Sequence, residues 1–229
     1  MQAYKYSTEC GHTEPQTFRV DPKRLRRRMV SQLEAQGISD PNVLKAMAAV
    51  PRHLFIQDAL EAQAYQDAPI PIGCGQSISQ PYIVALMSEL LEVRQGLRVL
   101  EVGTGSGYQA AVLAALGCTV FTIERLRELY LNASALLRQM PFRGIYTYLG
   151  DGTLGMPDAA PFERIIVTAG SPETPQPLLD QLEEGGILLI PVGMRPRQYL
   201  MRLRKRQGRV ESETLEPVIF VDLIGDHGW

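Results

Sequence analysis

Short apolar runs alternate with helical patterns from Gly96 onward, and this alternation predicts βαβ units around a parallel sheet. Two later runs, YLMRLRKR and VESETLEPVIFVDL, flank Gln207-Gly208, a dipeptide that suits a hairpin turn. We therefore expect an α/β fold, with a Rossmann-like, doubly wound, mostly parallel sheet and antiparallel C-terminal edge strands. The strands expected in the parallel part are 98–102, 119–124, 146–149, 164–168 and 187–191.

The chain before this sheet carries helical patterns. Met29 and Leu33 keep the spacing of a helix that stops at Gly37, and Asp40-Pro41 is a cap and first turn for a second helix, which ends near Val50. A third helix is expected over 81–93, where apolar residues recur on one helical face. The preceding stretch, 65–80, is rich in proline and glycine but apolar, which favours a functional loop.

These patterns divide the chain into four parts. Residues 1–22 lack periodicity and are expected to form a mobile tail. A helical and substrate-loop region (23–95) and a Rossmann-like ligand-binding domain (96–224) follow, and we expect 23–224 to form one compact unit. Residues 225–229 are expected to form a C-terminal tail.

Composition narrows the range of partners. With 229 residues, 45% of them apolar, and a net charge of -2, the sequence is typical of a soluble globular protein that binds neither nucleic acid nor membrane. The basic residues of 23–28 are interpreted as a solvated helix face. Cys10, Cys74 and Cys118 form neither a disulfide framework nor a metal-spaced pair, so we expect a cytoplasmic protein without a bound metal.

The densest chemical signal is RVLEVGTGSGYQAAVLAALG, a buried strand followed by a glycine turn and an alanine-rich helix. Glycines at 103, 105 and 107 permit positive φ and let a ligand approach the backbone, while the first helical N–H groups face its anionic end. A tight structural turn is the simpler alternative. Glu124 lies 21 residues after Gly103, where a doubly wound fold has an acid that accepts hydrogen bonds from ribose hydroxyls.

The spacing of this turn is G-x-G-x-G, which makes a dinucleotide cofactor the second choice. With Glu101 two residues before the first glycine, the segment resembles the first motif of class I S-adenosylmethionine-dependent methyltransferases. The resemblance implies that Glu101, Gly103, Thr104, Gly105, Gly107 and Glu124 bind the methyl donor. It also implies that Asp151 and Gly152, after the third strand, read the adenine edge, although Asp151 alone fits a cap or an Asx turn equally well.

Several further segments, taken together, resemble the protein-L-isoaspartate O-methyltransferase family, and the similarity covers roughly residues 29–223. They are Val50-Pro51-Arg52-His53-Leu54-Phe55, YQDAPIPIG (65–73), QSISQPY (76–82), Gly150-Asp151-Gly152 and RIIVTAG (164–170). This sequence departs from the family pattern at Cys74, Ser77 and Asp222, which stand where glycine, threonine and proline are common.

The resemblance implies methyl transfer from S-adenosylmethionine to the carboxylate of L-isoaspartyl residues in damaged proteins and peptides, followed by repair through a succinimide. Ser79 matches the catalytic serine, Ser79, Gln80 and Pro81 the substrate-binding segment, and Ile78 a donor contact. A carboxylate is already ionised at neutral pH and needs no general base, so the lack of an obvious His/Asp pair fits this chemistry. An amine acceptor is disfavoured, because VTAGS (167–171) replaces the Asn/Asp-Pro-Pro-Tyr turn of N-methyltransferases.

Simpler roles remain open for single residues. Ser79 also fits the N-cap of the helix that begins near Pro81, and Asp67 fits a side chain bonded to its own chain rather than to substrate. His53 is expected to pack beside Phe55. For the whole protein, two other functions stay open: methylation of another peptide carboxylate, and non-catalytic sensing of S-adenosylmethionine. The oligomeric state is not readable from the sequence.

Overall fold

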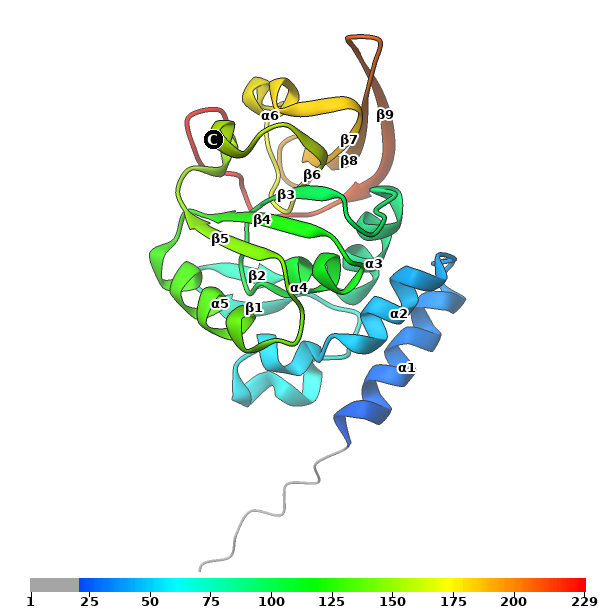
Figure 1. Ribbon diagram of the computed structural model, residues 1–229. Helices are drawn as coiled ribbons and strands as arrows, with labels where there is room; N and C mark the ends of the chain where they lie inside the picture. The colour runs from blue at the N-terminus through cyan, green and yellow to red at the C-terminus, as the bar shows by residue number, and fades with distance from the viewer. Residues whose placement is uncertain (1–20) are drawn as a thin grey trace, which may run out of the picture.

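The computed structural model describes residues 21–229 and confirms the α/β class (Figure 1). Its main sheet has seven strands in the order β5-β4-β3-β6-β7-β8-β9, in which β3 to β7 pair in parallel and β8 and β9 are antiparallel. The strands are β3 (Arg98–Val102), β4 (Thr119–Glu124), β5 (Ile145–Leu149), β6 (Phe162–Val167), β7 (Leu182–Val192), β8 (Gln198–Arg206) and β9 (Arg209–Val218).

Local sequence signals locate most of these strands. The expected bounds of β3 and β4 are confirmed to the residue, whereas β7 begins five residues earlier than expected. The turn between β8 and β9 is confirmed at Gln207 and Gly208, whose φ values of 52° and 69° are those of a type I′ hairpin. The sheet is therefore the part of the fold that the hydrophobic pattern predicts best.

Helices cover both faces of the sheet. The α-helices are α1 (Pro22–Ala35), α2 (Pro41–Ala49), α3 (Pro81–Leu90), α4 (Tyr108–Ala115), α5 (Arg127–Gln139) and α6 (Gln176–Asp180). Short 3-10 turns are η1 (Arg52–Phe55), η2 (Asp58–Gln63), η3 (Gly152–Leu154) and η4 (Pro157–Ala159). In Figure 1, α6 lies on the opposite side of the sheet from α4 and α5.

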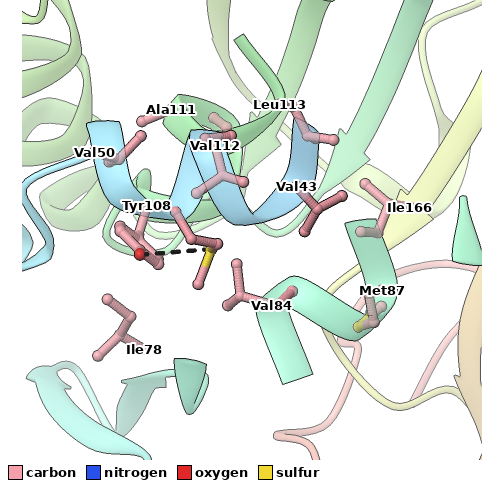
Figure 2. Close-up of a cluster of buried hydrophobic side chains, with 14 of the residues drawn as sticks. Val43, Val50, Ile78, Val84, Met87, Tyr108, Ala111, Val112, Leu113 and Ile166 are labelled. Atoms are coloured by element: carbon pink, nitrogen blue, oxygen red, sulfur yellow. Dashed lines mark hydrogen bonds between the residues drawn. The ribbon is translucent and has the colours of Figure 1, made fainter. Parts of the chain in front are cut away.

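Alternate residues of the central strands supply a separate core to each face. Val99 of β3 and Ile166 of β6 pack with α1 to α4, whereas their neighbours Leu100 and Ile165 pack on the α6 side. The first core joins the helical region to the glycine-loop helix, and Figure 2 shows Val43 of α2 near Ile166 of β6. Residues of both 23–95 and 96–224 therefore contribute to this first core.

Both N-terminal helices begin at an aspartate followed by a proline, and the expected cap of the second helix at Asp40 is confirmed. Asp21 caps α1 through the amide of Lys23 (2.9 Å), and Asp40 caps α2 through the amide of Asn42 (2.8 Å). The expected boundary of the tail at residue 22 is wrong by two residues, since Asp21 and Pro22 already belong to the start of α1. Residues 1–20 of that expected tail lie outside the described residues.

Two other expectations about loops change. The stretch 65–80 contains a small antiparallel hairpin of β1 (Ile70–Gly73) and β2 (Gln76–Ile78), whose turn holds Cys74 at a φ of 51°. The C-terminal residues fold back onto the domain: the Trp229 indole donates to the carbonyl of Gly170 (3.0 Å), and the amide of Asp226 donates to Asp151 (2.8 Å). Neither segment has a hydrophobic periodicity from which the hairpin or the C-terminal hydrogen bonds could be predicted.

Candidate active site

The glycine turn connects β3 to α4 and approaches the end of β6. Gly103 has a φ of 98°, and a Cβ there would lie 2.5 Å from Oγ1 of Thr168. The Thr168 hydroxyl donates to the carbonyl of Gly103 (2.6 Å) and fastens the turn to β6. Gly107 has a φ of 87°, occupies the N-cap of α4 and lies close to Leu137, so it shapes the turn without lining the cleft.

A cleft opens beside this turn at the carboxyl ends of β3, β4 and β6, where ligands bind in open α/β sheets. Strand β2 and helix α3 form its other side, and Figure 2 shows that Ile78, Val84 and Met87 of this wall belong to the buried core, as does Tyr108 at the start of α4. The expected site residues that line it are Ile78, Ser79, Glu101, Gly103, Thr104, Gly105, Glu124 and Gly152.

Glu101 is a fully buried acid in the wall of this cleft, and neither of its carboxylate oxygens has a hydrogen-bond partner. Burial raises the pKa of Glu101 to about 8; the nearby hydroxyl of Thr122 opposes the rise, and the charge of Glu124 adds to it. An unpaired buried carboxylate is costly. Its position therefore fits a cationic ligand group that would supply the missing donors.

Glu124 ends β4 and is 5% exposed. One carboxylate oxygen accepts from the amide of Gly105 (2.8 Å), and the other accepts from the amide of Leu126 (2.9 Å). The carboxylate thus holds the glycine turn against the following loop. Because each oxygen can accept more than one hydrogen bond, Glu124 keeps acceptor capacity toward hydroxyl groups in the cleft.

Asp151 lies outside the lining of the cleft, although Gly152 is part of it. The Asp151 carboxylate accepts from the amide of Thr153 (2.8 Å) and from the amide of Asp226 (2.8 Å), so the alternative of a capping residue for η3 is confirmed. Burial disfavours the charge, but these bonds outweigh it and hold the pKa of Asp151 below its ordinary value. The structure thus brings the backbone of this turn to the cleft and not the side chain.

Ser79 lines the cleft and also an adjoining groove, which Gln80 and Glu216 help to line. The alternative of an N-cap is wrong for Ser79, because Gln80 occupies the cap of α3 and makes no side-chain bond there. Asp67 supplies the missing acceptor instead: its carboxylate accepts from the amide of Tyr82 (2.9 Å). Pro81 is buried in the first turn of α3 and lines neither space.

His53 contacts a different ring from the one expected. Its Nδ1 lies 2.7 Å from the hydroxyl of Tyr65, and the two rings are tilted with centroids 5.8 Å apart. Phe55 packs edge-on against Tyr108 instead. The expectation that His53 packs beside Phe55 is therefore wrong, because the 3-10 turn η1 directs neighbouring side chains apart.

Sequence reasoning missed the part of the chain that closes the cleft. Residues 221–224 line it, held by bonds from the amide of Gly170 to the carbonyl of Val221 (2.7 Å) and from the amide of Leu223 to the carbonyl of Gly170 (2.8 Å). Gln109 was also missed, although a polar residue in the apolar stretch YQAAVLAA is a readable signal. Its amide donates to Ser88 (3.0 Å).

Features of two other kinds of site are absent from the described part of the chain. Among residues 21–229, no group of three or more His, Cys, Asp and Glu side chains is arranged to hold a metal ion. Over the same residues, no helix has the length and apolar character that crossing a bilayer requires.

Comparison with known proteins gives one consistent result. The family model for protein-L-isoaspartate(D-aspartate) O-methyltransferase matches residues 24–228. A relative from Methanoculleus marisnigri, named protein-L-isoaspartate O-methyltransferase, is 54% identical over 212 residues, which are 92% of this chain and 96% of the relative. One from Syntrophobacter fumaroxidans, named protein-L-isoaspartate O-methyltransferase 1, is 52% identical over 211 residues, covering 92% and 99% of the two chains.

Solved structures agree with these relatives. A protein-L-isoaspartate O-methyltransferase superposes with a TM-score of 0.82 at 27% identity, over 89% of this chain and 67% of the other. A Plasmodium falciparum protein assigned to the same class of enzyme, solved with S-adenosyl-L-homocysteine, gives a TM-score of 0.77 at 27% identity, over 87% and 98%. The similarity thus extends through the helical region as well as the sheet.

Proposed function

The chain belongs to the protein-L-isoaspartate(D-aspartate) O-methyltransferase family, and we propose that Glu101, Glu124 and the glycine turn hold its methyl donor while Ser79 faces the acceptor. The enzyme methylates the free carboxylate of L-isoaspartyl residues in damaged proteins, which starts repair through a succinimide. Its donor is S-adenosylmethionine, which supplies a methyl group carried on a positively charged sulfur.

The residues of the cleft fit such a donor. S-Adenosylmethionine carries an ammonium group and a carboxylate at one end and ribose hydroxyls near the middle. The unpartnered carboxylate of Glu101 would accept from the ammonium group, and the remaining acceptor capacity of Glu124 would serve the ribose hydroxyls. The first amides of α4, which begins at Tyr108, favour the anionic end. The orphaned oxygens of Glu101 are the observation that carries this assignment.

The backbone around Gly152 favours a flat ring in the same cleft. A Cβ at this position would lie 2.5 Å from Cγ1 of Val102, so only glycine keeps the turn close to the end of β3. Because the Asp151 carboxylate is occupied by the amides of Thr153 and Asp226, we propose that backbone groups of this turn meet the adenine edge. The Asp151 side chain then acts by holding the turn in place.

Ser79 supports the acceptor side of the proposal because it lines both the donor cleft and the adjoining groove. An isoaspartyl residue has one methylene more in its backbone than an aspartyl residue, and its free carboxylate is attached directly to the α-carbon, so this carboxylate lies differently relative to the chain that presents it. The acceptor is ionised at neutral pH and needs no base. The protein's contribution is then alignment and exclusion of water, and the Ser79 hydroxyl would orient the carboxylate by a hydrogen bond.

Ser79→Ala tests the acceptor assignment. We expect a slower single-turnover methylation of an isoaspartyl peptide, with the affinity for S-adenosylhomocysteine and the melting temperature near those of the wild type. Ser77→Ala is a matched control, since Ser77 lines the same two spaces from β2. Wild-type single-turnover rates in folded, donor-saturated Ser79→Ala would remove Ser79 from the catalytic residues.

The substrate is tested with paired peptides that differ only in aspartate against isoaspartate at one position. The isoaspartyl peptide should be methylated far faster, because misalignment of the acceptor by even 1 Å costs about 100-fold in rate. The methyl ester should then release methanol as it cyclises. Equal rates for the two peptides, or a stable ester, would favour a different peptide carboxylate as the natural acceptor.

A further inference from the structure

Arg52 lies in η1 and is fully buried, yet no ion pair to it is found among residues 21–229. Its hydrogen-bond partners are backbone carbonyls: Nε donates to Ala64 (2.8 Å) and Nη2 to Ser79 (2.6 Å). The guanidinium carbon lies 4.7 Å from the ring centroid of Tyr108, and Nη1 has no partner. This charged side chain therefore neither pairs with a carboxylate of the described residues nor reaches the solvent.

A guanidinium in this position is unfavourable for stability alone. Removing a charge from water without an opposite charge is costly, and burial lowers the pKa of Arg52 from its ordinary value. The unpartnered Nη1 adds a donor that has lost its hydrogen bonds to water. An apolar side chain would fill the same space at a lower cost. The reason for an arginine must therefore lie in the groups that it joins.

The three groups around Arg52 come from separate parts of the chain. Ala64 follows η2, Ser79 connects β2 to α3, and Tyr108 is the first residue of α4 after the glycine turn. The planar fork of an arginine can satisfy two carbonyls at once in a fixed geometry, which a lysine cannot do. Arg52 thus joins the segment that carries Ser79 to the helix that follows the donor-binding turn.

Tyr108 makes this connection rigid. It is 1% exposed, and its hydroxyl donates to the sulfur of Met47 (3.8 Å), the dashed contact in Figure 2. Its ring packs edge-on against Phe55 of η1. Tyr108 also lines the cleft together with Ser79. The Arg52 guanidinium therefore lies between a fixed ring of the donor side and the carbonyl of Ser79.

We propose that Arg52 is a positioning residue for methyl transfer, which sets the place of Ser79 relative to the donor by holding the Ser79 carbonyl against Tyr108. The inference rests on the assignment of Ser79 to the acceptor side. Arg52 does not touch the reacting atoms. Its loss should affect the chemical step and leave donor binding intact, because its bonds fix the Ser79 segment and not Glu101 or Glu124.

The first test is Arg52→Lys, which keeps the charge but loses the two-carbonyl fork. We expect the single-turnover rate to fall at least about tenfold, since small misplacements of a reacting group are costly. The dissociation constant of S-adenosylhomocysteine should stay within about twofold. Leu33→Ala, a truncation of a buried residue of α1 that does not line the cleft, controls for a general loss of stability. If the lysine variant does not fold, Arg52→Gln replaces it.

The second test is a double-mutant cycle of Arg52→Lys and Ser79→Ala on the single-turnover rate. If Arg52 acts through Ser79, the double variant should be about as slow as Ser79→Ala alone. The proposal for Arg52 would be overturned if the rate reductions of the two single variants multiply in the double variant. It would also be overturned if folded Arg52→Lys has the wild-type rate while Ser79→Ala is slow. In both cases the assignment of Ser79 would stand. A wild-type rate in Ser79→Ala would overturn the assignment of Ser79 and that of Arg52 with it.

Discussion

The unpaired carboxylate of Glu101 makes a quantitative prediction about stability and pH. The pKa of Glu101 is raised from 4.5 to about 8, chiefly by burial. Below pH 4.5 the group is protonated in both folded and unfolded chains, and its contribution to folding is at its most favourable. As the pH rises toward 8, the unfolded chain loses this proton and the folded one keeps it, so stability falls by about 1.4 kcal/mol per pH unit.

Glu101→Gln keeps the shape of the side chain and removes the titration. Between the unfolded-chain pKa of 4.5 and the folded-state pKa of about 8, the wild type loses stability that the variant keeps. The free energy of unfolding of the variant, relative to that of the wild type, should therefore rise by as much as about 5 kcal/mol. At pH 5 the two proteins should differ little. The gain should grow steadily to pH 8 and then level off. All other titrating groups are shared, so they cancel in the difference.

The measurement is urea unfolding of the ligand-free proteins at several pH values from 5 to about 9, with donor affinity measured on the same samples. If Glu101 accepts from a cationic donor, binding should lower its pKa and release about 0.9 proton at pH 7. Calorimetry in buffers of different ionisation enthalpy counts that proton. A stability difference that does not change with pH, or equal proton release by wild type and Glu101→Gln, would refute the reasoning.

Three further predictions concern other parts of the structure. Glu124→Ala should weaken binding of S-adenosylhomocysteine by about 1–3 kcal/mol in calorimetric titration, because charged hydrogen bonds are lost and the amide of Gly105 loses its acceptor; unchanged affinity would exclude the ribose contact. Cys74→Gly should stabilise the protein by about 0.5–1 kcal/mol in urea unfolding, since Cys74 has a φ of 51° and glycine adopts that conformation without strain; a destabilised variant would contradict this. Deleting residues 226–229 should weaken donor binding in the same titration, because Asp226 and Trp229 hold the turn and the segment that line the cleft; affinity equal to that of the full chain would mean that the tail is dispensable.

The sheet and the glycine turn could be predicted because their signals are local. The strand β3, the glycines after it and Glu124 at the end of β4 all lie within residues 98–124, and the parallel order of the strands brings their ends together. Gln207-Gly208 carries its own turn conformation. In each case the residues that specify the structure are near neighbours in sequence.

The remaining features depend on partners that are distant along the chain. The side-chain acceptor at the start of α3 comes from Asp67, 15 residues before Tyr82, whereas a local reading offers only Ser79 as a possible N-cap. The Asp151 carboxylate is occupied by the amide of Asp226, 75 residues away, which no pattern around Asp151 announces. Arg52 donates to backbone carbonyls, and because every residue has a backbone carbonyl, the sequence does not show which ones will accept. Tertiary contacts decided the outcome at these positions.

The fold-back of the C-terminus gives the protein a built-in optical reporter. Trp229 is the only tryptophan of the chain, and its indole nitrogen donates to the carbonyl of Gly170, beside the segment that closes the cleft. The side chain is 42% exposed, so its emission should respond both to the polarity around the ring and to movement of the last residues. Fluorescence excited selectively in tryptophan therefore comes from this one position. Ligand-induced ordering of this end of the chain can be timed in a stopped-flow instrument without attaching a dye.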